Sequence, residues 1–331
     1  MPIVSKDAYK RSLAKRVSLN KQILKNPYWL FPVEDFGHED FMPVGRGDKS
    51  SSSCGVYRSL SVCDNIEGHR GKSLNGVDVT DKVIVRLNHL WCNKSSCSVC
   101  FIRGWSVNRA RAIEGRLAEA VFRGLGKVEH VVVSPAVADR GLSESVLRKM
   151  CRKALKDRGI VGGCMIFHGF RLAKGRDVLV WSPHYHVLGF LEGGYGCRGC
   201  IKSCSGCSGF EARTRECFKK DGMIVRVLPE RKTVFGTAWY QLNHASIRVG
   251  IKRFHCITWM GNCAKHMFKS PKVKAKIVCP CCDEEMVRSV HMGSRHIVKD
   301  IGHVDYVSIF ADERLDENGE LNYVPFGGGF G

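Results

Sequence analysis

Two strand-like runs joined by a short polar turn place the strongest constraint on the fold. Residues 163–171 and 177–181 are largely apolar, and the segment between them ends in Lys-Gly-Arg-Asp at 174–177, which is typical of a β-hairpin. The second run continues to Phe190, and Pro183 within it marks a break or the start of a strand. An antiparallel sheet is therefore expected at the centre of the chain.

Histidines occupy alternate positions of the second run. Alternate side chains of a strand share a face, so His184 and His186 project together while Tyr185 points away. A turn centred near residue 176 would pair His168 with His184, although a slip of one residue would reverse its face. The three imidazoles would then form a divalent-metal site, and imidazole favours Mn²⁺ or Zn²⁺ over Mg²⁺. Ordinary packing of strand histidines is the alternative.

A tyrosine and a histidine one helical turn apart form a second candidate group. Tyr240 and His244 lie in a segment predicted to be helical from Thr237 to about Val249, and their spacing puts them on one helix face. A tyrosine hydroxyl with its ordinary pKa near 10 needs a base or a polarised target to act as a nucleophile. A metal ion on a phosphate oxygen would polarise the target, and His244 could be the base or a further ligand. Without such partners the pair would be core packing.

The charge balance indicates a polyanion partner. The chain has 52 Lys+Arg against 32 Asp+Glu, a net charge of +20, which is typical of nucleic-acid binding. A generically basic protein or a membrane-surface binder is the alternative. Residues 105–124 predict an amphipathic helix, and we expect its arginines to contact DNA: Arg109, Arg111 and Arg116.

The location expected for the chain determines how its 17 cysteines are interpreted. The sequence has no membrane-spanning apolar run and no signal-peptide core near Met1, so we expect the cytoplasm of a prokaryotic host. Cysteines in a reducing compartment favour metal ligation over disulfides.

Cysteine spacing predicts two or three structural zinc sites. Before the arginine-bearing helix the predicted ligands are Cys63, Cys92, Cys97 and Cys100, with Cys54, His69 and His89 competing for the upstream positions. Within the central region they are Cys197, Cys200, Cys204 and Cys207, with Cys217 as a substitute. Near the C-terminus Cys279 and Cys282 form a knuckle, and its partners stay open among Cys256, Cys263, His266 and His291.

Three of these motifs occur in an order that resembles the HUH endonuclease superfamily. They are the run Val-Val-Val-Ser-Pro at 131–135, the pair His184 and His186, and Tyr240 on a later helix. Over residues 126–260 the chain most resembles the rolling-circle replication initiators of small plasmids and viruses, of archaeal type. The resemblance implies an α+β fold with a palm-like central antiparallel sheet flanked by helices. Cysteine-rich zinc-binding elements would lie before, within and after this sheet.

The same resemblance implies a chemistry. The histidine pair would hold Mn²⁺ or Mg²⁺, and Tyr240 would attack a backbone phosphate of single-stranded origin DNA. This leaves a 5′-phosphotyrosine and a free 3′-hydroxyl, and a second transesterification religates the strand. His244 stands where two-tyrosine members have a second tyrosine, which favours a cycle with a single nucleophile.

Other partners and alternative functions follow from what the motifs lack. Residues 68–73 resemble the end of a phosphate-binding loop, but position 66 is Ile66 and not the required glycine. With no ATP-binding domain, the chain would need a host helicase and polymerase. An HUH transposase or mobilisation relaxase would share the chemistry. A non-catalytic multi-zinc nucleic-acid-binding protein is the rival of a different class.

The predicted organisation has four parts. They are a basic N-terminal extension at 1–50, a zinc-binding element with the arginine-bearing helix at 51–125, an HUH endonuclease domain at 126–270 with a Cys-rich insert at 193–217, and a C-terminal zinc knuckle with a Gly-rich tail at 271–331.

Overall fold

The computed structural model describes most of the central chain and several shorter segments. The described residues are 32–33, 40–47, 51, 53–55, 57–74, 76–192, 216–229, 233–249, 254–269, 277–289, 306–308, 314–315 and 321–322. None of the helices among them has the length and apolarity that a membrane crossing requires.

The chain divides into two compact units. The larger unit comprises residues 27–50 and 93–272, and the smaller comprises 1–26, 51–92 and 273–331. This division differs from the predicted one. The arginine-bearing helix belongs to the same unit as the region predicted to be the endonuclease, and residues 51–92 belong with the C-terminal part of the chain.

A six-stranded sheet forms the centre of the larger unit. Its strand order is β12-β7-β8-β6-β10-β9, and every neighbouring pair is antiparallel. The predicted hairpin supplies the two longest strands, β7 and β8, and the α+β class is confirmed. The bounds are β6 Val128–Pro135, β7 Ile160–Leu172, β8 Leu179–Leu191, β9 Glu216–Lys220, β10 Met223–Val227 and β12 Ile257–Gly261.

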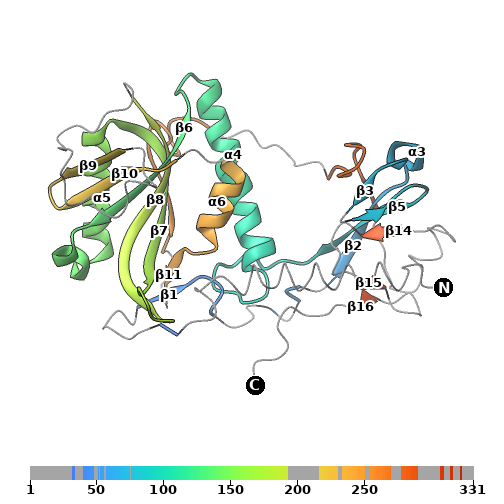
Figure 1. Ribbon diagram of the computed structural model, residues 1–331, viewed down its shortest axis with the longest axis horizontal. Helices are drawn as coiled ribbons and strands as arrows, with labels where there is room; N and C mark the ends of the chain where they lie inside the picture. The colour runs from blue at the N-terminus through green and yellow to red at the C-terminus, as the bar shows by residue number, and fades with distance from the viewer. Residues whose placement is uncertain are drawn as a thin grey trace. The chain divides into compact units, whose positions relative to one another are not determined.

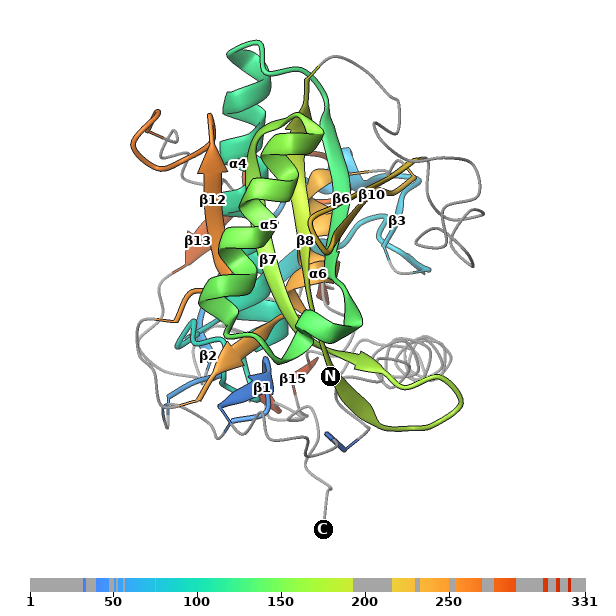
Figure 2. The ribbon, with the colours of Figure 1, turned by 90° about the vertical axis from the view of Figure 1, so that its left-hand side faces the viewer.

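Helices cover the two faces of this sheet. Helix α5 (Glu144–Arg158) packs on one face, whereas α4 (Val107–Phe122) and α6 (Val234–Leu242) pack on the other, as Figures 1 and 2 show. We refer to the second face as the α4/α6 face. Because strand side chains alternate between faces, each face has its own core.

The cores follow the period of the strands. On the α4/α6 face, the stripe Ala110, Ile113, Leu117 and Ala120 of α4 shares a cluster with Cys164, Ile166, Leu188 and Phe190 of β7 and β8. On the α5 face, Leu147, Cys151 and Leu155 pack with Met165, Phe167, Tyr185 and Val187. Each buried aliphatic side chain contributes about 1.5–3 kcal/mol, so the two clusters hold the helices to the sheet.

The helix boundaries agree only in part with the sequence predictions. Helix α5 begins directly after Ser143 and is closed by Gly159, which follows Arg158 with φ +90°. Helix α4 is preceded by a π-helical segment, η1 (Phe101–Ser106). The prediction that the helix of Tyr240 runs to Val249 is wrong. Helix α6 ends at Leu242, and the chain then forms β11 (Ser246–Arg248), which pairs with β1 (Phe41–Pro43).

The smaller unit contains a four-stranded sheet of order β13-β2-β5-β14. Val79, Ile84, Met286, Cys63 and Cys279 form a small buried cluster beside it. The remaining elements are short. The bounds are β2 Tyr57–Cys63, α3 Ile66–His69, β3 Ser73–Leu74, β4 Val77–Asp78, β5 Val83–His89, β13 Val287–Ser289, β14 Tyr306–Ser308, β15 Arg314–Leu315 and β16 Leu321–Asn322.

Candidate active site and metal centres

The three predicted histidines come together on the α4/α6 face. The register pairs His168 directly with His184, as predicted, and His186 follows two residues along the same strand. Each residue offers a ring nitrogen, and the three nitrogens lie within 4.8 Å of one another. We call this group the histidine cluster, and it could bind a metal ion.

A β-bulge beside the cluster explains how a proline fits in a central strand. Strand β8 is continuous through Pro183, but two of its residues, Ser182 and Pro183, stand opposite the single residue Gly169 of β7. A proline lacks the N–H that a regular ladder needs, and a bulge removes that requirement. The bulge lies immediately beside the paired histidines and sets their position on the sheet.

Neighbouring groups orient two of the rings. His184 Nδ1 lies 2.7 Å from the carbonyl oxygen of Ser182, so this nitrogen carries the proton and Nε2 keeps its lone pair. The backbone of Gln241 hydrogen-bonds the His168 ring. His168 Nε2 is buried and makes no hydrogen bond to any described residue. A metal ion bound to this nitrogen would satisfy it. A ring N–H held by a backbone carbonyl is the arrangement usual for histidine ligands.

A fourth histidine, which the sequence did not single out, stands behind the cluster. His130 of β6 places Nε2 3.0 Å from His186 Nδ1, and the two rings stack with centroids 5.2 Å apart. Gln241 Nε2 lies 3.4 Å from the same His130 nitrogen. The only signal in the sequence was a histidine directly before the apolar run at 131–133, because the pairing of β6 with β8 could not be predicted.

The histidine cluster is held neutral. Burial lowers the pKa of His168, His184 and His186 well below the ordinary value, and neighbouring imidazoles and Arg171 lower it further. Neutral imidazoles keep the lone pair that a metal ligand requires. No carboxylate of the described residues joins the group, so a bound dication would keep its full charge.

Arg171 adds a positive charge at the edge of the cluster. Its Nη2 donates to Ser134 Oγ at 2.9 Å, and its Nε lies 3.2 Å from His184 Nδ1. That nitrogen cannot accept from Arg171 while it donates to Ser182, and the shorter Ser182 contact decides the tautomer. Arg171 therefore acts on the cluster through its charge.

The Tyr240 and His244 pair lies on the same face as the histidine cluster. The two rings meet edge to face with centroids 4.5 Å apart, and the His244 ring is 6.3 Å from that of His168. Tyr240 is 49% exposed, whereas His244 is buried, and burial lowers the pKa of His244 to about 4. The arrangement places a half-exposed tyrosine, a neutral imidazole and a group that could bind a metal ion in sequence.

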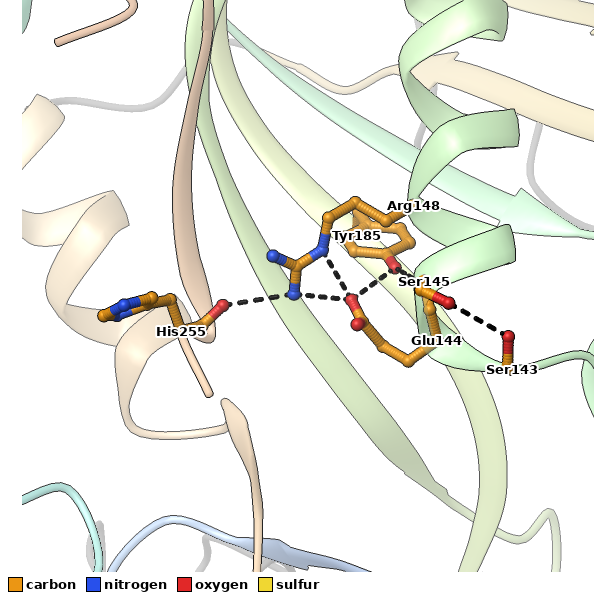
Figure 3. Close-up of polar contacts among 6 residues, drawn as sticks. All are labelled: Ser143, Glu144, Ser145, Arg148, Tyr185 and His255. Atoms are coloured by element: carbon orange, nitrogen blue, oxygen red, sulfur yellow. Dashed lines mark hydrogen bonds and ion pairs between the residues drawn. The ribbon is translucent and has the colours of Figure 1, made fainter. Parts of the chain in front are cut away.

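Tyr185, between the two strand histidines, points to the opposite face, as predicted. Its hydroxyl donates to Glu144 Oε1 at 2.9 Å, and Glu144 pairs with Arg148, which in turn donates to the carbonyl of His255 (Figure 3). Burial and the Glu144 charge raise the pKa of Tyr185. Tyr185 therefore anchors β8 to α5 and is unsuited to act as a nucleophile.

The three arginines that were predicted to contact DNA differ in their exposure. Arg109 and Arg111 are exposed on α4. The prediction for Arg116 is wrong, because this side chain is buried. Its guanidinium donates to the carbonyls of Cys263 and Ala264 and lies over the Phe268 ring, so it holds α4 to the segment after β12.

Two further groups of ligand atoms could bind metal ions such as zinc, each with its atoms within 4.8 Å of one another. The first, which we call the four-cysteine cluster, is Cys54, Cys92, Cys97 and Cys100. The second, which we call the mixed cluster, is Cys63, His69, Cys279 and Cys282. The cysteines in the described part of the chain form no disulfide.

These groupings correct the predicted ligand sets. Cys63 does not join Cys92, Cys97 and Cys100, because it ends β2 beside His69, and Cys54 takes the fourth position. Cys279 and Cys282 share one group, but their partners are none of the expected ones. Cys256 and Cys263 are buried in the core of the α4/α6 face, and His266 is exposed.

The predicted substitute ligand Cys217 belongs to neither group. Cys217 is buried on β9. Cys197, Cys200, Cys204, Cys207 and His291 lie outside the described residues.

The chain matches no protein-family model, no curated protein and no solved structure.

Proposed function

We propose that this chain is a metal-dependent enzyme that nicks and rejoins single-stranded DNA through Tyr240. The observation that supports this proposal most strongly is the common position of two groups. The histidine cluster and the Tyr240–His244 pair occupy one face of one sheet, with His244 between Tyr240 and His168. Core packing alone would not require an accessible tyrosine beside a group of imidazoles. The net charge of +20 suits a DNA substrate.

The proposed reaction needs few groups. Tyr240 Oη forms a bond to the scissile phosphorus, the bond from phosphorus to the 3′-oxygen breaks, and that oxygen takes up a proton from water to leave as a 3′-hydroxyl. His168, His184 and His186 would hold a divalent cation, which supplies neutralisation of charge on the phosphate. His244 is neutral and faces Tyr240, so it can accept the tyrosine proton and return it when the strand is rejoined.

Arg171 would assist by binding the phosphate. Its guanidinium stands beside His184, and a site of neutral ligands with an added cation attracts an anion. Arginine suits phosphate oxygens because its planar donors can bind two of them at once. Arg171→Lys keeps the positive charge but removes the planar pair of donors, so it should still weaken DNA nicking.

The biological setting that fits best is rolling-circle replication initiation in a prokaryotic cytoplasm, with a host helicase and polymerase. We expect Mn²⁺ or Mg²⁺ at the histidine cluster and Zn²⁺ at the two cysteine-rich groups. An HUH transposase or relaxase would use the same residues. The rival is a non-catalytic zinc protein that binds nucleic acid, in which the buried histidines are packing.

Adduct formation tests the proposal. The full chain is incubated with labelled single-stranded oligonucleotides of random sequence and Mn²⁺, and label that stays with denatured protein is measured. Wild type should form an adduct, and Tyr240→Phe should form none while binding the DNA equally well. Tyr185→Phe is the matched control, because it removes the other hydroxyl near the cluster from the opposite face, and it should form the adduct.

The alternatives give different outcomes. An adduct with Tyr240→Phe would show that another residue is the nucleophile. Tight binding of DNA by wild type without any adduct, with every divalent cation tried, would favour the non-catalytic zinc protein.

A further inference from the structure

The mixed cluster has the properties of a closed structural zinc site. We propose that one zinc ion binds Cys63, His69, Cys279 and Cys282, and that it holds residues 277–289 against the β2–α3 segment. The inference is independent of the nicking activity. It concerns the smaller unit alone.

The ligand atoms already converge. His69 Nε2 lies 3.4 Å from the sulfurs of both Cys63 and Cys279, and the sulfurs of Cys63 and Cys282 are 3.5 Å apart. Sulfur and nitrogen ligands about 2.0–2.3 Å from one zinc ion are separated by about 3.3–3.8 Å in a tetrahedron. Four ligands complete that tetrahedron and leave no position for a substrate, which is typical of structural sites.

The histidine is oriented from behind. His69 Nδ1 lies 2.8 Å from the carbonyl oxygen of Lys82, so Nδ1 carries the proton and Nε2 presents its lone pair to the three sulfurs. Without a metal ion, this tautomer leaves a buried acceptor facing thiols. A zinc ion would bind that lone pair and the deprotonated sulfurs together.

The backbone around the cysteines forms a tight knuckle. The amide of Asp283 donates to the carbonyl of Cys279, and the amide of Cys279 donates to the carbonyl of Glu284. Asp283 has φ +62°, a left-handed conformation that Asp tolerates better than most residues. This turn brings both Cys279 and Cys282 to the group, whereas Cys281 is not part of it.

The two segments also meet around the cluster. Lys72 Nζ donates to the carbonyl of Cys281 at 2.5 Å, and Asn65 Nδ2 donates to Glu284 Oε1 at 2.6 Å. At Gly68 an added Cβ would lie 2.9 Å from Cys282 Cβ, so no larger residue fits there without a shift. These contacts join the segment at 65–72 to the segment at 281–284.

Among the described residues, few buried side chains surround the mixed cluster. Besides the ligands Cys63 and Cys279, the buried cluster contains Val79, Ile84 and Met286, and small units with few buried side chains usually need a staple. The ligands come from two stretches of chain separated by the whole of residues 93–272. Loss of the ion should therefore release residues 277–289 from β2 and α3.

Metal content tests the site with adjacent cysteines as matched variants. Zinc per chain is measured by mass spectrometry on the purified full chain. Cys282→Ser and His69→Ala should each lose one zinc equivalent relative to wild type. Cys281→Ser should lose none, and His69→Cys should keep the ion because it restores a fourth ligand.

A second measurement avoids variants that fail to fold. In wild type loaded with cadmium, the metal's nuclear resonance should include a signal in the range for three sulfurs and one nitrogen, separate from a four-sulfur signal of the four-cysteine cluster. Limited proteolysis within residues 277–289 should become faster in Cys282→Ser but not in Cys281→Ser. Equal zinc loss in the two serine variants, or no cadmium signal for three sulfurs and one nitrogen, would overturn the proposal.

Discussion

The histidine cluster and the mixed cluster differ in the type of their ligands and in where these come from along the chain. The histidine cluster takes its ligands from two paired strands that are close in sequence, with His168 on β7 and His186 on β8. It has three neutral donors and no carboxylate among the described residues. The mixed cluster takes its ligands from chain segments that are far apart, and three of its four donors are thiols.

This difference fits the two roles that we propose, a reactive site at the histidine cluster and a structural site at the mixed cluster. Three neutral imidazoles would leave coordination positions open on a metal ion, where a phosphate oxygen could bind. Three thiolates and an imidazole close the tetrahedron and bind zinc with apparent free energies of roughly 10–16 kcal/mol. In our proposals, the sheet would therefore present an exchangeable ion, whereas the ion of the smaller unit would hold that unit's fold.

Removal of a ligand from the histidine cluster should have the largest effect. His184→Ala or His186→Ala should lower the rate of nicking by about 10³-fold or more, as loss of charge stabilisation in a transition state does. Zinc content should stay at the wild-type value, because the cysteine-rich groups are untouched. Both quantities are measured on one preparation, and a parallel loss of zinc would break the distinction between the two sites.

Chelation should separate the two sites without mutation. Dialysis against EDTA should abolish nicking within the time needed to remove a cation held by neutral imidazoles, and added Mn²⁺ should restore it. The thiolate-bound zinc should remain throughout, measured by mass spectrometry. Zinc that leaves at the same rate as activity would contradict the proposed contrast in affinity.

Acid should destabilise the α4/α6 face. His244 has a pKa of about 4 when folded and about 6.5 when unfolded, so between these values the unfolded state binds the extra proton. Stability therefore falls as the pH drops from about 6.5 towards 4, by up to about 3 kcal/mol from this residue. Urea unfolding at several pH values should show a weaker pH dependence for His244→Asn, and an unchanged one would refute the assignment.

The residue behind the cluster should have a smaller effect. His130→Ala removes the contact with His186 Nδ1 but no proposed ligand, so affinity for Mn²⁺ should fall by about 10–100-fold. Calorimetric titration of Mn²⁺ measures this, and saturating Mn²⁺ should restore most of the nicking. A loss of nicking that no Mn²⁺ concentration restores would instead make His130 part of the reacting site.

Local pattern was sufficient for part of the candidate site. The short turn between two apolar runs predicted the hairpin. Its register alone would place His168 opposite Pro183, since Phe170 pairs with Trp181, and the bulge at Ser182 and Pro183 shifts the pairing by one residue to His184. The alternation of a strand likewise predicted that Tyr185 would point away from the cluster. These inferences concern residues that are close in sequence.

Other features depended on packing between distant segments. His130 became part of the site only because β6 pairs with the side of β8 that faces away from β7. The sequence did not distinguish Arg116 from Arg109 and Arg111, which are arginines of the same helix. Arg116 is buried because the loop after β12 covers it. Helix α6 ended early because β11 pairs with β1, a partner from a much earlier part of the chain.

The sequence by itself therefore determined the donor types, their alternation on one strand, the basic charge and the antiparallel hairpin. Only the tertiary structure decided which cysteines meet, that Tyr240 lies over the same face as the histidines, and which arginine is buried. The physical reason is range. Alternation and turns act over a few residues. Cys63 and Cys279, in contrast, are brought together by the packing of strands and loops that no local pattern specifies.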